Sequence, residues 1–155
     1  MNKTHLIAAL ALLSCACSGS DEIGETRSAI AAFNPGDTPQ TGHLVVAMAN
    51  APLSCASLSE ALIVEGPGCD SPSWRVELAI PELLANEGTT VTLDTPDLFV
   101  SMGQQGGDCH SGEPQIDSGQ LELVEIRQSE VVVDLQAITQ SSVDPSGVYT
   151  APLCR

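Results

Sequence analysis

The residues with the clearest chemistry are four cysteines in the body of the chain, Cys55, Cys69, Cys109 and Cys154. Thiols can bond to each other, bind a metal ion or act as nucleophiles. No two of them have the Cys-x-x-Cys spacing of thiolate metal sites, which disfavours such a site. In a short chain that folds in an oxidising compartment, an even number of cysteines instead predicts two disulfides.

The four cysteines can pair in three ways. We expect Cys55–Cys69, which closes a local loop, together with Cys109–Cys154, which joins a loop to the last strand. The rival pairing, Cys55–Cys154 with Cys69–Cys109, stays open. Each bond would contribute about 2–4 kcal/mol to the free energy of unfolding, on the view that it restricts the unfolded chain.

Carboxylates in loops are the second kind of candidate. Asp108, Glu113 and Asp117 share one stretch, and Asp94 and Asp97 share another. Ca²⁺ binds about six to eight oxygen atoms, mostly from carboxylates and backbone carbonyls, so these residues are candidate calcium ligands. The spacing of an EF-hand loop is absent. Paired carboxylates also serve glycosidases, but among 20 acidic residues many pairs lie close by chance.

A nucleophile with a partner base is not evident. His110 directly follows Cys109, but neighbours on an extended chain point apart, and a disulfide would remove the thiol. His43 precedes an apolar run and is expected at the surface. The nucleophile elbow, the zinc-protease motif, the Walker loop and the dinucleotide-binding glycine motif are all absent. The sequence therefore predicts a protein that is not an enzyme and holds no cofactor other than, at most, Ca²⁺.

These residues are expected on short strands and their connections. Apolar runs or period-two alternation predict strands over residues 43–48, 74–80, 89–93, 98–102, 120–126, 131–138 and 148–151. The alternation in 74–80 predicts one buried and one solvated face. Residues 57–64 fit either a strand or a helical turn, and the glycine-rich stretch 103–112 is expected to be a loop.

Many short strands separated by turns predict an all-β fold, an antiparallel β-sandwich of the immunoglobulin-like or a similar type, with two disulfides. This domain is expected over residues 41–155. Residues 18–40 are rich in Ser, Gly, Asp, Glu, Thr and Pro, which predicts a flexible acidic tether. Trp74 is expected in the core.

Residues 1–17 have the order of a bacterial export signal. Lys3 supplies a positive charge, residues 6–13 form an apolar run, and small residues follow. The run is shorter than the ~20 residues that a membrane-spanning helix needs. The segment Leu12-Leu13-Ser14-Cys15 resembles the lipobox of bacterial lipoproteins, and the alternative register ends at Cys17.

This resemblance implies that the signal is removed and that a lipid is attached to Cys15, or in the alternative register to Cys17. Neither cysteine is followed by Asp, which by the same resemblance implies the outer membrane. Acyl chains hold a soluble domain at a membrane because each buried methylene contributes about 0.8 kcal/mol. Secretion with cleavage nearby and no lipid is the alternative.

The chain has a formal net charge of −15 at pH 7. Beyond Lys3, its basic residues, histidines aside, are Arg27, Arg75, Arg127 and Arg155. Such a surface repels nucleic acid and anionic lipid headgroups, which excludes nucleic-acid binding. It attracts divalent cations and cationic partners, although the acidity could also serve only to solvate the surface.

The C-terminal part, with the hairpin of 120–138, the Asp144–Gly147 turn and the closing Cys154, resembles small uncharacterised bacterial surface lipoproteins. This resemblance brings no activity with it. The expected function is therefore a structural or binding role at the cell envelope, for a lipid-anchored monomer with a protein partner at the cell surface. Two alternatives stay open, a calcium-stiffened adhesion module and a secreted hydrolase with a carboxylate site.

Overall fold

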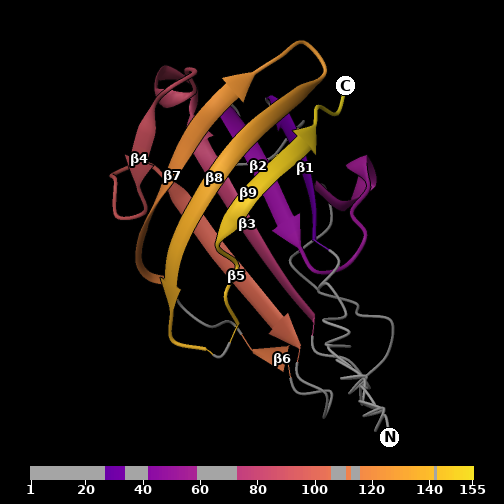
Figure 1. Cartoon of the computed structure of the whole chain (residues 1–155), viewed down its shortest axis with the longest axis vertical. Coiled ribbons are helices and arrows are strands. Elements are labelled where there is room, and N and C mark those ends of the chain that lie inside the picture. The colour runs from indigo at the N-terminus through magenta and orange to yellow at the C-terminus, as the bar shows by residue number, and fades with distance from the viewer. Residues whose placement is uncertain (1–26, 34–41, 59–72, 106–110, 113–115, 142) are drawn as a thin grey trace, which may run out of the picture.

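The computed structural model describes residues 27–33, 42–58, 73–105, 111–112, 116–141 and 143–155. These residues form an all-β fold of two antiparallel sheets (Figure 1), as predicted. Sheet A has the order β1 (Ser28–Phe33), β2 (His43–Ala49), β3 (Ser73–Pro81), β5 (Phe99–Gln105) and β6 (Ser111–Gly112). Sheet B has the order β4 (Thr90–Thr92), β7 (Ile116–Ile126), β8 (Glu130–Thr139) and β9 (Gly147–Pro152). Two short 3-10 helices, η1 (Cys55–Leu58) and η2 (Glu82–Leu84), connect strands.

The main hydrophobic core lies between the two sheets, which pack face to face (Figure 1). Alternate residues of each strand point into it, as the period of two along a strand requires. Most are aliphatic, among them Leu44, Val46, Val76, Leu78, Leu121, Leu123, Val133 and Leu135. Trp74 is 1% exposed within this core, so its predicted burial is confirmed.

Strand β3 is buried on both faces, which corrects the prediction of one solvated face. Every residue from Ser73 to Ile80 is buried. On the face of sheet A that points away from sheet B, Ala79 packs with Leu58 of η1 and with residues of β1 and β2 in a second hydrophobic cluster. The polar and apolar residues alternate as expected, but the segment after β2 crosses the far face of the sheet and removes it from water.

Strand β1 lies inside the stretch expected to be a flexible tether, so that expectation is wrong for residues 28–33. All six residues of β1 pair with β2, from Ser28 opposite Ala49 to Phe33 opposite Leu44. Successive residues of β1 point to opposite faces of sheet A. Ala31 packs into the main core, and Ile30 packs into the second cluster. Burial therefore overrides the low strand propensity of alanine.

The two sheets meet where β1 lies beside the chain segment that follows β9. Ala31 forms an isolated parallel bridge with Leu153. The backbone N–H of Leu153 in turn donates to the carbonyl oxygen of Ser129 at 2.8 Å, in the β7–β8 connection. One edge strand of each sheet, β1 in sheet A and β9 in sheet B, thus lies beside the other sheet, which limits its pairing with another chain.

The predicted strands 43–48, 120–126 and 131–138 are confirmed as β2, β7 and β8. The β7–β8 hairpin has a register shift between Leu123 and Glu125, so Val124 and Glu125 together oppose Val132. This is a β-bulge, which bends the strand and strengthens its twist. The predicted strands at 74–80, 89–93, 98–102 and 148–151 correspond to β3, β4, β5 and β9.

Two connections differ in detail from the expectation. Strand β5 continues to Gln105 and pairs with β6, so both ends of the stretch 103–112 are strand rather than loop. The start of 57–64 is helical, since Leu58 ends η1, and the remainder of that stretch lies outside the described residues.

Candidate functional site

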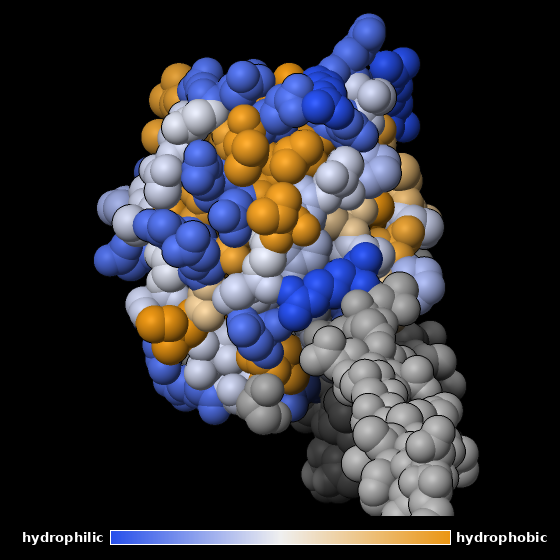
Figure 2. Space-filling view, viewed as in Figure 1, coloured by the Kyte–Doolittle hydropathy of each residue, from blue (hydrophilic) through white to orange (hydrophobic). Residues whose placement is uncertain are grey.

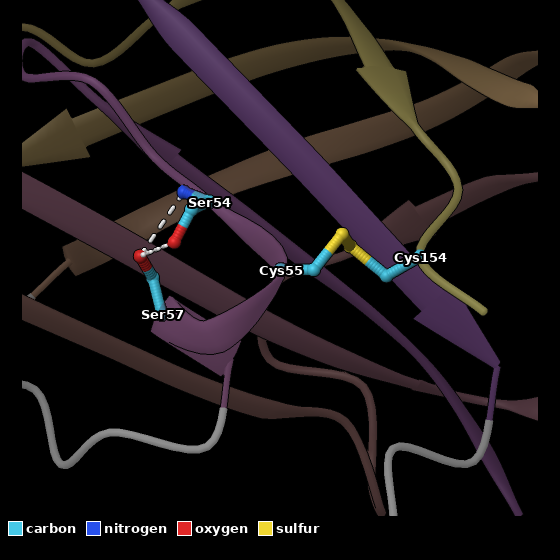
Figure 3. Close-up of a disulfide and its surroundings, with 4 residues drawn as sticks. All are labelled: Ser54, Cys55, Ser57 and Cys154. Carbon is cyan, nitrogen blue, oxygen red and sulfur yellow. Dashed lines mark hydrogen bonds between the residues drawn. A yellow bond between two sulfur atoms is a disulfide. The ribbon is translucent and has the colours of Figure 1, made fainter.

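A disulfide joins Cys55 in η1 to Cys154 near the end of the chain (Figure 3), with the two Cα atoms 5.5 Å apart. The expected pairing of Cys55 with Cys69 and of Cys109 with Cys154 is therefore wrong. The observed bond is one half of the rival pairing, and the other half, Cys69–Cys109, lies outside the described residues. Cys154 reaches Cys55 because the chain runs past β9 along β1 and packs on the second cluster, where η1 also lies.

Two serines hold the turn that presents Cys55. The backbone N–H of Ser54 donates to Oγ of Ser57 at 3.1 Å, and the N–H of Ser57 donates to the carbonyl oxygen of Ser54 at 2.8 Å. Figure 3 shows the serine side chains on the opposite side of Cys55 from the sulfur bond. Reciprocal bonds of this kind stabilise a single turn. They therefore fix the backbone from which the Cys55 sulfur reaches Cys154.

Most other predicted site residues lie outside the described part of the chain: the lipidation candidates Cys15 and Cys17, the cysteines Cys69 and Cys109, and the calcium candidates Asp108 and Glu113. In the part of the chain that the structure does describe, no helix has the length and hydrophobicity of a membrane span.

The described calcium candidates are dispersed. Asp117 accepts a hydrogen bond from Nε2 of Gln140 at 2.5 Å. Asp94 and Asp97 are exposed between β4 and β5, and Asp97 has a φ of 68°, a conformation that Asp tolerates. Among the described residues, no three His, Cys, Asp or Glu side chains lie close enough to share a metal ion. Calcium binding stays a prediction.

A buried ion pair lies on the far face of sheet A. Nη2 of Arg75 donates to Oε2 of Glu77 at 2.9 Å and to the carbonyl oxygen of Ser57 at 2.6 Å. The side chains of Arg75 and Glu77 are 5% and 11% exposed. The pair thus connects β3 to η1, the turn that carries Cys55.

Small neighbours make room for these two long side chains. Arg75 lies between Ala49 and Gly103, and Glu77 lies between Ala47 and Ser101. Burial raises the pKa of Glu77, and the charge and hydrogen bond of Arg75 partly oppose that rise.

Three polar atoms beside the pair have no hydrogen-bond partner among the described residues, Nε of Arg75 and the hydroxyls of Ser73 and Ser101. A buried charge with an incomplete set of partners is costly, so the pair depends on its remaining contacts. Because both charges are covered, we assign this pair a structural role. The sequence did not predict this buried pair, because a polar residue at every second position is also the pattern of a solvated face.

The face of sheet B that points away from sheet A is open to solvent. Figure 2 shows hydrophobic surface at the centre of this face, over β7, β8 and β9. Val124 on β7 and Val148 on β9 are 43% and 69% exposed, and Val132 lies between their strands on β8. We call Val124, Val132 and Val148 the valine patch.

Carboxylates border the valine patch. Glu122 on β7 is directly opposite Asp134 on β8, and Asp134 is directly opposite Val148 on β9. Like charges in directly opposite positions of a sheet repel each other. The patch therefore combines exposed aliphatic groups with two carboxylates at directly opposite positions of neighbouring strands.

Arg127 lies at one end of this face, in the β7–β8 turn. Its guanidinium donates to both carboxylate oxygens of Glu125, at 2.6 and 2.5 Å, and also to Glu130. These hydrogen bonds raise the pKa of Arg127 further. Arg127 therefore pairs with Glu125 and Glu130 and does not neutralise the carboxylates of Glu122 and Asp134.

The β8–β9 connection at the other end is held by Tyr149 and Arg27. The hydroxyl of buried Tyr149 donates to the carbonyl oxygen of Pro145, and Arg27 donates to the carbonyl oxygens of Ser146 and, at 3.3 Å, Asp144. Asp144 Oδ1 accepts from the Ser146 N–H at 2.9 Å, and hydrogen bonds from Ser146 lower the pKa of Asp144. A tyrosine hydroxyl that bonds to backbone a few residues upstream fixes a corner in immunoglobulin-type domains.

Two features of the described residues differ in their access to a partner. The buried pair of Arg75 and Glu77 is enclosed, whereas the valine patch and its carboxylates are accessible to a partner. The valine patch and its carboxylates are therefore the candidate functional site. Comparison with known proteins found no matching family model, no similar curated protein and no similar solved structure.

Proposed function

We propose that the chain is an exported lipoprotein, anchored at the outer membrane through Cys15, with a two-sheet domain that has a structural or binding role in the cell envelope. The observation that carries the proposal is the lipobox-like segment Leu12-Leu13-Ser14-Cys15 ahead of a domain that contains a disulfide. Structural disulfides persist in oxidising compartments outside the cytoplasm, so the bond between Cys55 and Cys154 supports export.

The position of β1 makes the proposed anchor short. Ser28, the first residue of β1, follows Cys15 by 13 residues. A fully extended chain of that length spans at most about 45 Å. A lipid on Cys15 would therefore hold Ser28, at one end of sheet A, within about 45 Å of the membrane surface.

The β-sandwich with two disulfides is part of the same proposal. Cys55 and Cys154 are bonded to each other, so Cys69 and Cys109 are the pair that remains for a second bond. A role that relies on exposed surface rather than on catalysis is consistent with the accessible valine patch.

Metabolic labelling with an alkyne analogue of palmitate tests the anchor. The full chain is expressed in a Gram-negative host as the wild type and as Cys15→Ser, Cys17→Ser and the double variant. We expect label and outer-membrane fractionation in the wild type and in Cys17→Ser, and loss of label in Cys15→Ser and in the double variant. Cys17→Ser is the matched control, because it changes a cysteine of the same segment.

Mass spectrometry of the mature N-terminus completes the test. An acylated Cys15 supports the proposal as stated. An acylated Cys17 would move the anchor to the alternative register. An unmodified mature N-terminus beyond Cys17, together with no incorporated label, would overturn the proposal in favour of plain secretion.

A further inference from the structure

We propose that the valine patch, Val124, Val132 and Val148, together with Glu122 and Asp134, binds a cationic protein segment in which basic and aliphatic side chains share one face. The inference deepens the proposed binding role and rests on it, but it does not depend on the lipid anchor.

The three valines lie on three neighbouring strands. Val124 lies in the bulge opposite Val132, and Val148 is the diagonal neighbour of Val132, which itself opposes Thr150. Diagonal neighbours in a sheet are about 7–8 Å apart, within reach of one bound side chain. Single exposed valines are ordinary, but adjacent ones that form a patch are typical of interaction sites.

Glu122 and Asp134 supply the negative charge beside the valine patch. They are directly opposite each other on neighbouring strands, where like charges repel. A lysine or arginine placed between them would relieve that repulsion. Arg127 does not supply this charge, since its hydrogen bonds go to Glu125 and Glu130.

The spacing between the valines and the carboxylates defines the partner. Val132 and Asp134 are two residues apart on the same face of β8. An extended partner segment that carries an aliphatic residue at one position and a basic residue two positions later presents both side chains to this face. The preferred occupant is therefore a basic, partly aliphatic stretch of another protein.

A second copy of the chain is a poor occupant. A symmetric contact through this face would bring Glu122 and Asp134 of two molecules together, between chains that each carry a net charge of −15. An anionic membrane surface is repelled for the same reason.

Fluorescence anisotropy tests the inference with the purified full-length mature chain in a non-ionic detergent. The probe is fluorescein-labelled Lys-Ser-Val-Ser-Lys-Ser-Val-Ser-Lys, which has lysine and valine on one face when extended. Two control peptides replace either every valine by serine or every lysine by glutamate. We expect binding of the probe, about tenfold weaker binding without valine, and no binding without lysine.

Variants locate the site. Val124→Thr with Val148→Thr should weaken binding about fivefold, and Glu122→Gln with Asp134→Asn should weaken it and reduce its dependence on salt. Leu83→Thr, in η2 and 91% exposed, and Asp94→Asn, exposed between β4 and β5, are matched controls that should bind like the wild type.

Three results would overturn the inference. They are no binding of the probe, binding that the valine and carboxylate variants leave unchanged, and concentration-dependent dimerisation in sedimentation velocity that Val124→Thr with Val148→Thr abolishes. The same titration on a Cys15→Ser, Cys17→Ser chain separates the two proposals. Peptide binding that persists in an unlipidated chain supports the docking surface whatever the anchor proves to be.

Discussion

The backbone N–H of Cys154 donates a hydrogen bond of 2.7 Å to the carbonyl oxygen of Ala31, so the last residues of the chain lie along its first strand. The disulfide to Cys55 fastens the same point to η1. One short region thus joins β1, the chain end and the turn that covers the far face of sheet A. Residues at both ends of the domain are held there.

Removal of this disulfide should cost much of the stability of the domain. The bond closes a loop with a sequence separation of 99. Loop-closure entropy for such a length predicts a loss of about 4–5 kcal/mol in the free energy of unfolding for Cys55→Ala with Cys154→Ala. Guanidinium denaturation monitored by tryptophan fluorescence measures this, with Trp74 as the single tryptophan of the chain. An unchanged midpoint would show that the bond does not constrain the unfolded chain.

The pairing itself can be read, without reduction, from a digest with trypsin and a glutamate-specific protease. Cleavage after Glu60 and Glu65 separates Cys55 from Cys69, and cleavage after the later Glu and Arg residues places Cys109 and Cys154 on two further peptides. The Cys55–Cys154 bond links the peptides 28–60 and 131–155. A digest in which 131–155 is linked only to the peptide of Cys69 or to that of Cys109 would contradict it.

Loss of one member of the Arg75–Glu77 pair should destabilise the domain more than loss of both. Arg75→Met leaves the buried Glu77 carboxylate without its cation, for which we expect a loss of about 3–5 kcal/mol. Arg75→Met with Glu77→Met removes both charges and keeps side-chain volume, so most of that loss should be recovered. Urea denaturation of the two variants and of Glu77→Gln measures the difference. Equal losses in the single and double Met variants would mean that packing, not charge, dominates.

The raised pKa of Glu77 predicts a pH dependence of defined sign. Because burial raises the pKa in the folded state, the folded protein binds this proton more tightly than the unfolded chain does. The resulting stabilisation is complete below the ordinary value of 4.5 and is lost as pH rises through the folded pKa. The unfolding free energy of the wild type relative to Glu77→Gln should therefore fall as pH rises from 4.5 and then level off. A relative stability that rises over that range would refute the assignment.

The parts of the fold that sequence predicts are those with a local signal. Alternating apolar residues are enough to identify β7 and β8, and the lone tryptophan, Trp74, is one of the apolar residues of the alternating segment 74–80. All three members of the valine patch fall in predicted strands, and Val124 lies at a bulge of its strand. Their shared surface follows only from the register of β7, β8 and β9, which a single strand does not encode.

The parts that sequence did not predict depend on contacts between distant segments. Strand β1 is rich in alanine, and only burial on two sides makes it a strand. The disulfide partner of Cys55 is decided by the path of the chain after β9, not by loop length. The burial of Arg75 likewise depends on η1, whose Ser57 carbonyl covers it.

The corner at Tyr149 should respond to loss of a single oxygen atom. Tyr149→Phe keeps the ring in the core but leaves the carbonyl of buried Pro145 without its hydroxyl donor. We expect a loss of about 1–2 kcal/mol in the free energy of unfolding. Thermal and urea denaturation measure it, and Thr150→Val, on the exposed face of β9, is the control. A Phe variant as stable as the wild type would mean that water replaces the lost hydroxyl.

Two glycines with positive φ offer a comparison of steric clash with backbone strain alone. A Cβ at Gly119, whose φ is +151°, would lie 2.1 Å from the carbonyl oxygen of Gln136 and 2.9 Å from Cα of Ala137. Backbone atoms of the paired strand β8 cannot move aside without breaking the hairpin, so Gly119→Ala should cost about 3 kcal/mol or more. A Cβ at Gly88, with φ +75°, meets nothing within 4 Å. Gly88→Ala should therefore cost only the strain, about 1 kcal/mol. Urea denaturation of both variants gives the difference, and equal losses would mean that β7 shifts along β8 to admit the methyl group.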